Sequence, residues 1–113
     1  MIQDEIPGWL RIWMQGVLLR NVYPALRAVA VGYYDDRTVT LRFYVDRSPV
    51  EFDHWVMEVI CGELLSNTST NAEMPALRDE IVFSTRDQNE LEALSGFVFM
   101  RMEDFDTFDH EAS

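Results

Sequence analysis

The strongest constraint on the fold lies at residues 46–53, where a predicted strand ends and a predicted helix begins. Ser48 is a suitable N-cap, Pro49 suits the first helical position, and Glu51 falls at the third. This spacing predicts a capping box, which typically stabilises a helix by about 1 kcal/mol. We therefore expect a helix over residues 49–65 that lies directly against the strand before it.

Hydrophobic periodicity predicts two helices and four strands in one domain. The predicted elements are a helix over residues 6–21, strands over 27–34 and 37–46, the helix over 49–65, and strands over 80–85 and 97–103. Short connections favour antiparallel pairing of consecutive strands. The sequence therefore predicts an α+β fold in the order α-β-β-α-β-β. Its two layers are a four-stranded antiparallel sheet and two helices. Residues 1–113 would form a single domain, with 104–113 as a flexible acidic tail.

The first two strands are predicted to form a hairpin around Asp35 and Asp36 as a two-residue turn. That register pairs Ala28 with Phe43 and Ala30 with Leu41. It turns the small residues of the first strand toward the helices. A slip of one residue would exchange the two faces of the strand.

The two predicted helices differ in how completely they should be covered. The first helix is apolar nearly all round, and Ile12 and Leu19 fall opposite its main apolar face. We expect both sides to be covered; the alternative is an apolar strip that binds a partner. In the second helix the expected buried stripe is Phe52, Val56, Val59, Ile60 and Leu64, with Cys61 on the far side. Glu63 enters that stripe, so either it pairs with an arginine or the helix frays before it.

The charge balance separates classes of partner. The 113 residues include 20 acids and 9 bases, a formal net charge of −11. Such a chain repels nucleic acids and anionic membranes and attracts basic proteins; acidity that only maintains solubility is the competing explanation. The single cysteine, Cys61, cannot form an internal disulfide, and no run approaches the ~20 apolar residues of a membrane span. The N-terminus carries acids where a signal peptide carries bases, so we expect a cytoplasmic protein.

The sequence contains no recognisable catalytic motif. It lacks a glycine-rich phosphate loop and a G-x-S-x-G element, so we predict no enzyme activity and no cofactor. Glu51, His54 and Glu58 share one helical face, and Glu-x-x-His is a ligand spacing in di-iron bundles. Such sites need two of these motifs, and His110 is the only other histidine. A solvated polar face is therefore favoured over a metal site.

Protein recognition is the remaining function class. Acidic side chains recur around the hairpin and the helix after it, close in sequence to large aromatic residues. Aromatic anchors inside a charged rim are typical of tight interfaces, although the same rings could be half-buried core. The predicted partner-binding residues are Asp35, Asp36, Tyr44, Asp46, Glu51, Asp53, Trp55 and Glu58.

Three blocks of the sequence resemble a known family. They are Tyr23-Pro24-x-x-Arg27-Ala28-Val29-Ala30-Val31, the run from Arg42 to Asp53, and Leu94-Ser95-Gly96-Phe97-Val98-Phe99-Met100-Arg101. They resemble the small acidic immunity proteins of bacterial polymorphic toxin systems, including contact-dependent growth inhibition. The resemblance implies a cytosolic protein that binds the toxic C-terminal domain of an incoming effector. Many such toxins are nucleases, whose basic surfaces an acidic inhibitor can fill as a phosphate mimic.

Three hypotheses follow. The first is a non-enzymatic immunity protein, monomeric or weakly dimeric, that neutralises a basic nuclease through an acidic surface. The second is a cytosolic adaptor or regulatory subunit that docks through its apolar N-terminal helix. The third is a metal-dependent enzyme that uses Glu51, His54 and Glu58.

Overall fold

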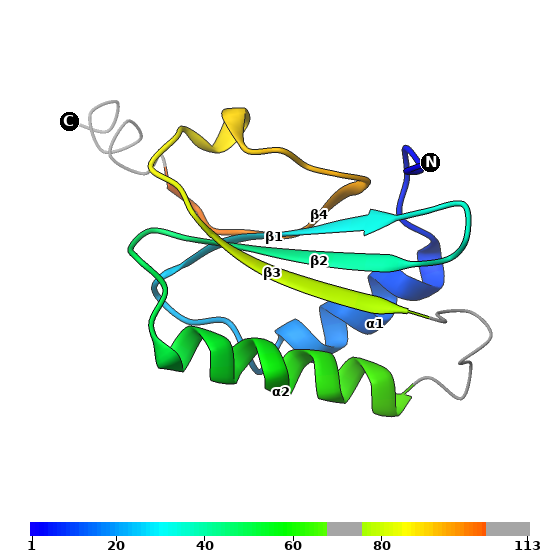
Figure 1. Cartoon of the computed structure of the whole chain (residues 1–113). Coiled ribbons are helices and arrows are strands. Elements are labelled where there is room, and N and C mark those ends of the chain that lie inside the picture. Colours follow the sequence, from blue (N-terminus) through cyan, green and yellow to red (C-terminus); the bar gives the residue numbers. More distant parts are fainter. Residues whose placement is uncertain (68–75, 104–113) are drawn as a thin grey trace.

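The computed structural model describes residues 1–67 and 76–103, and within them the predicted order of two helices and four strands is confirmed (Figure 1). The elements are α1 (Gly8–Leu18), β1 (Leu26–Tyr33), β2 (Val39–Val45), α2 (Glu51–Asn67), β3 (Leu77–Phe83), the short 3-10 helix η1 (Gln88–Glu90) and β4 (Gly96–Met100). The predicted tail, residues 104–113, lies outside the described residues. Neither helix in the described part of the chain has the length and hydropathy that crossing a bilayer requires.

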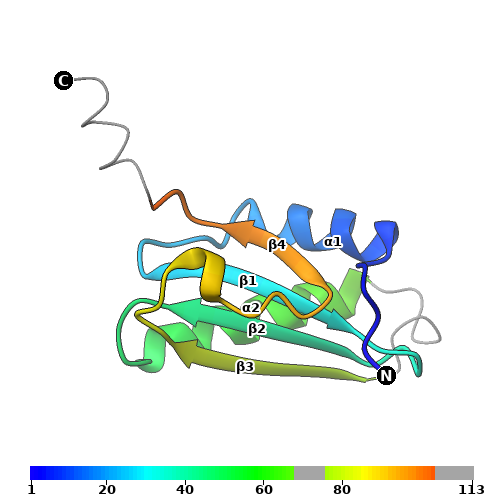
Figure 2. The ribbon, with the colours of Figure 1, turned by 90° about the horizontal axis from the view of Figure 1, so that it is seen from above.

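The four strands form one mixed sheet in the order β3-β2-β1-β4 (Figure 2). β1 is antiparallel to both β2 and β4, but β3 is parallel to β2, so the prediction of a purely antiparallel sheet is wrong. The reason is α2, which runs back along the sheet and lets β3 start beside the start of β2. This is a β-α-β crossover, in which a helix joins two parallel strands. β3 and β4 consequently lie at opposite edges and do not form a hairpin.

The β1–β2 hairpin is shifted by one residue from the predicted register. Asp35, Asp36 and Arg37 form a three-residue loop, in which Arg37 adopts a positive φ of 68°. The backbone N–H of Tyr34 donates to the carbonyl of Thr38 across the base of this loop, at 3.1 Å. The extra loop residue exchanges the two faces of β1 relative to β2.

As a result, two separate cores form on the two faces of the sheet. The helices cover the first face, where the larger residues Val29 and Val31 of β1 lie with Phe43 of β2. Ala28 and Ala30 point to the opposite face, contrary to the prediction. There the connection between β3 and β4 crosses the sheet (Figure 1) and packs Leu91 against the alanines and Tyr44. Small side chains permit this close approach.

The faces of the helices also differ from the prediction. On α1, Ile12 is 68% exposed and Leu19 is 83% exposed, so the expectation that both sides are covered is wrong. The buried stripe of α2 consists of Asp53, Val56, Met57, Ile60, Cys61 and Leu64. Phe52 is therefore half-exposed, and Cys61 is buried, contrary to the prediction for each. Glu63 does pair with an arginine, Arg20, at 3.0 Å.

Candidate partner-binding surface

A row of three aromatic rings lies at the start of α2. Tyr23, from the turn after α1, meets Phe52 edge to face, with ring centroids 5.1 Å apart. Phe52 in turn contacts Trp55, one helical turn further on, at 5.9 Å. Phe52 is 48% exposed and Trp55 is 59% exposed. Two neighbouring exposed aromatic rings of this size are characteristic of a contact surface.

The buried carboxylate of Asp53 holds this row in place. Its Oδ1 accepts from the Tyr23 hydroxyl at 2.5 Å, and its Oδ2 accepts from Arg47 at 2.6 Å. Oδ2 also accepts the backbone N–H of Val50 at 2.7 Å, three residues earlier. Asp53 therefore acts as the acidic partner of a capping box, two residues later than the predicted box of Ser48 and Glu51. The Asp53 side chain thereby fastens the turn between α1 and β1 to the start of α2.

The same contacts set the protonation states of these groups. Burial opposes ionisation of Asp53, but the hydrogen bonds from Arg47, Tyr23 and Val50 outweigh it and hold the pKa of its carboxyl below the usual value. Burial and the hydrogen bond to Asp53 raise the pKa of Tyr23. The carboxylate is therefore ionised and the phenol protonated near neutral pH, which preserves the network.

Two free carboxylates lie beside the exposed rings. Glu51 and Glu58 are exposed, and they fall at i−4 and i+3 of Trp55 on the same side of α2. Within residues 1–67 and 76–103, no ion pair joins either carboxylate to a base. We refer to Glu51, Phe52, Trp55 and Glu58 as the α2 surface. It combines apolar area with negative charge that the described protein does not neutralise.

The other predicted partner-binding residues are not part of this surface. Asp35 and Asp36 lie in the β1–β2 loop, whereas Asp46 follows the other end of β2. Asp53 is only 1% exposed and Tyr44 is 4% exposed, so neither can be a surface contact. Tyr44 instead donates its hydroxyl to the Glu92 carbonyl at 2.8 Å on the opposite face of the sheet. The eight predicted residues therefore do not form one surface.

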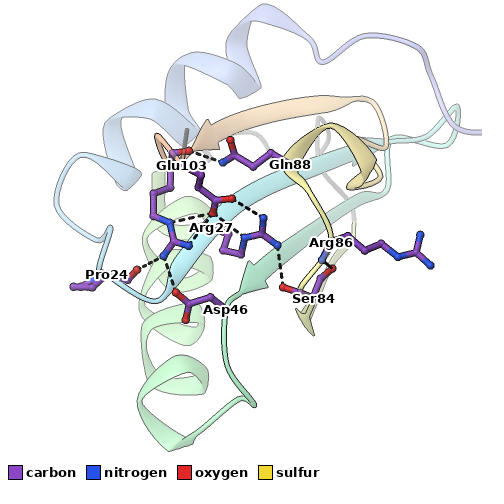
Figure 3. Close-up of polar contacts among 8 residues, drawn as sticks. Pro24, Arg27, Asp46, Ser84, Arg86, Gln88 and Glu103 are labelled. Atoms are coloured by element: carbon purple, nitrogen blue, oxygen red, sulfur yellow. Dashed lines mark hydrogen bonds and ion pairs between the residues drawn. The ribbon is translucent and has the colours of Figure 1, made fainter. Parts of the chain in front are cut away.

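Asp46 belongs to a structural network of charges (Figure 3). It accepts from Arg101 at 2.8 Å, and Arg101 also bonds Glu103. Glu103 holds the buried Arg27 through two contacts of 2.7 and 2.6 Å, and Arg27 also donates to the Ser84 carbonyl. These bonds join β1 to the chain after β3 and after β4. A hollow of about 760 Å³ lies alongside, and Arg27, one of the two arginines that line it, is already paired with Glu103.

A second exposed apolar area lies on α1. A shallow groove of about 480 Å³ runs between α1 and β4, lined by Gln15, Gly16, Leu18, Leu19, Val22, Val98 and Phe99. Ile12 adds a further exposed side chain on the same helix. This groove is the surface that the adaptor hypothesis requires.

Two candidate reactive sites have simpler roles. Cys61 is buried and donates its thiol to Asp79 at 3.4 Å. Burial raises the pKa of the thiol to about 12, so it is not a thiolate near neutral pH. Glu51, His54 and Glu58 lie exposed on α2, and the described part of the chain contains no group of three or more His, Cys, Asp and Glu that could hold a metal ion.

Comparison with known proteins identifies the family. The family model of the MafI2 immunity protein matches residues 7–103, which span both helices and the whole sheet. The chain belongs to the MafI2 immunity protein family. The resemblance to immunity proteins of polymorphic toxin systems is confirmed. No curated protein matches the chain.

Membership of the MafI2 immunity family means that the chain acts by binding and neutralising a cognate toxin protein. The sequence predicted Glu51, Trp55 and Glu58 as partner-binding residues, and the structure places all three at the surface of α2, but Phe52 was predicted in the core. Tyr23 was also missed as the support of the row. The available signal was the i, i+3 spacing of Phe52 and Trp55, which puts both rings on one side of a helix.

Proposed function

We propose that this MafI2 immunity protein neutralises its toxin by covering a basic surface of the toxic C-terminal domain with the α2 surface. It catalyses no reaction itself and acts in the cytoplasm. The observation that carries the proposal is the pair of free carboxylates, Glu51 and Glu58, on either side of the exposed Trp55. Carboxylates that have no ion-pair partner among the described residues remain available to a basic protein.

A nuclease is the toxin class that fits this charge best. An enzyme that cleaves nucleic acid carries a basic surface, because it must hold phosphates. An inhibitor with a net charge of −11 is attracted to such a surface from a distance. Steering of this kind raises association rates by about 10- to 10³-fold at low salt. Fast capture is valuable where a single toxin molecule can do damage.

Charge reversal tests the proposed contact. We expect that replacing both Glu51 and Glu58 with lysine slows association with the toxin domain by about tenfold or more at low salt. Replacing Glu90 with lysine is the control for position, compared with Glu51→Lys alone, which changes the net charge by the same amount; Glu90 is also exposed but lies in η1, away from α2. Stopped-flow association rates at several salt concentrations provide the measurement. Equal rates for the wild type and the double variant would contradict the proposal.

Co-expression with the toxin tests the wider function. The wild-type protein should protect cells and co-purify with the toxin domain. Protection without any complex would show that the protein does not act by direct binding.

The adaptor function remains the second candidate, because the structure leaves Ile12 and Leu19 exposed. Under the adaptor function, α1 rather than α2 would be covered in a complex. Substitutions at Ile12 and at Trp55 therefore distinguish the adaptor function from the proposed immunity contact.

A further inference from the structure

We propose that Trp55 is the anchor of the complex, and that it enters an apolar pocket of the toxin domain whose rim carries arginine. This inference rests on the proposed function and specifies how the partner is recognised. Glu51 and Glu58 would meet the basic rim, while the indole supplies most of the buried apolar area. Steering and anchoring are thereby assigned to different residues of the α2 surface.

The size and exposure of Trp55 support its role as an anchor. A tryptophan can bury some 150–250 Å², and tryptophan is enriched among the residues that dominate binding energy. Trp9 and Trp13 pack against the main core, whereas Trp55 is 59% exposed. An exposed indole on a regular helix makes few contacts within the free protein, so a partner can bury most of its surface.

The support beneath Trp55 is already packed in the free protein. Trp55 contacts Phe52, and Phe52 contacts Tyr23. The Tyr23 hydroxyl is fixed by the carboxylate of Asp53, which is 1% exposed. Pre-organisation reduces the side-chain entropy lost on binding, and it therefore strengthens the contact that the ring makes.

The charges around the ring identify the chemistry of the partner. Free carboxylates at i−4 and i+3 favour a cationic rim, and arginine also stacks on indole through a cation–π contact. A second copy of this chain is a poor partner for the α2 surface, because its own net charge of −11 would repel the first copy. The α1 groove has no such pair of free acids, and the nearby Arg20 is basic and bound to Glu63.

The test measures binding kinetics with the purified C-terminal domain of the cognate toxin. Trp55→Ala should raise the dissociation rate by about 30-fold or more and change the association rate by less than about threefold. Trp55→Phe should recover most of the lost affinity, since it restores an aromatic ring. The double variant Glu51→Gln, Glu58→Gln should act mainly on association.

Ile12→Ala is the matched control, because Ile12 is 68% exposed on the other helix. It should leave both rates unchanged, and all variants should keep the wild-type thermal midpoint. If Trp55→Ala dissociated from the toxin domain at the wild-type rate, or if Ile12→Ala dissociated faster than the wild type, the anchor role of Trp55 would be overturned. The immunity function would still stand. If the wild-type protein does not bind this domain at all, the proposed function fails together with the anchor.

Discussion

Asp53 decides which face of α2 is buried. Sequence reasoning placed it at the surface, because a carboxylate is almost never fully buried unless it is paired. Its partners explain the exception: Arg47 and Val50 are local, but Tyr23 comes from 30 residues earlier. The local half of this pattern was readable from the sequence as an acid three residues after the cap. The contact with Tyr23 depends on the tertiary fold and was not readable.

Replacing Asp53 with asparagine should cost about 2 kcal/mol of unfolding free energy at pH 7, since hydrogen bonds to a buried charged group are lost. Because the folded-state pKa of Asp53 is lowered, its contribution is complete above the ordinary carboxyl pKa of about 4 and is lost as the pH falls through the folded pKa. Urea unfolding should therefore show the two proteins converging in acid. Glu51→Gln is the control and should change stability by less than about 0.5 kcal/mol. A difference that persists undiminished at low pH would contradict this account.

At the scale of the elements, the sequence predicted the existence of the helices and strands well and their pairing poorly. The β1–β2 hairpin was expected, but one additional loop residue, Arg37, exchanged the faces of β1. Arginine at a positive φ gives no sequence signal, because glycine or asparagine usually fills such a position. The position of β3 was missed for another reason. A helix of 17 residues can return the chain to either edge and in either direction, and side-chain packing decides between them.

Glu103, just after the end of β4, ties this part of the chain to Arg27 of β1. Glu103→Gln should cost about 3 kcal/mol, because it leaves the guanidinium of Arg27, which is 6% exposed, without its carboxylate. Glu92→Gln is the matched control: Glu92 is largely exposed, and its partner Arg42 keeps Glu80. The unfolding free energy that Glu92→Gln loses should stay below about 1 kcal/mol. Urea unfolding gives the energies, and amide exchange in β4 reports local opening. If Glu103→Gln and Glu92→Gln lost equal unfolding free energy, burial of the Arg27–Glu103 pair would not increase its contribution to stability.

At the scale of the whole molecule, the acidic side chains that dominate the composition are not concentrated on one surface. Many of the described acids are occupied in ion pairs that hold the fold together, such as those of Asp46, Asp53, Glu80 and Glu103. Composition cannot distinguish these acids from the free carboxylates of Glu51 and Glu58. That distinction depends on which arginines the fold brings near. Of the predicted acids, Asp36, Glu51 and Glu58 are in no ion pair within the described part of the chain, and only Glu51 and Glu58 lie together on α2.

The excess of acid predicts that salt has opposite effects on folding and on binding. Mutual repulsion among the charges destabilises the free protein, so raising sodium chloride from about 50 to 300 mM should raise its thermal midpoint by a few degrees. The same screening should slow capture of a basic toxin domain by about tenfold, because long-range attraction drives it. Calorimetry and stopped-flow association on the same samples measure the two trends. Glu51→Gln, Glu58→Gln should flatten the dependence of association on salt while leaving that of the midpoint nearly unchanged, since only two of 20 acids are removed. If the midpoint falls with salt, the ion pairs outweigh the repulsion, and net charge is then not what limits the stability of the free protein.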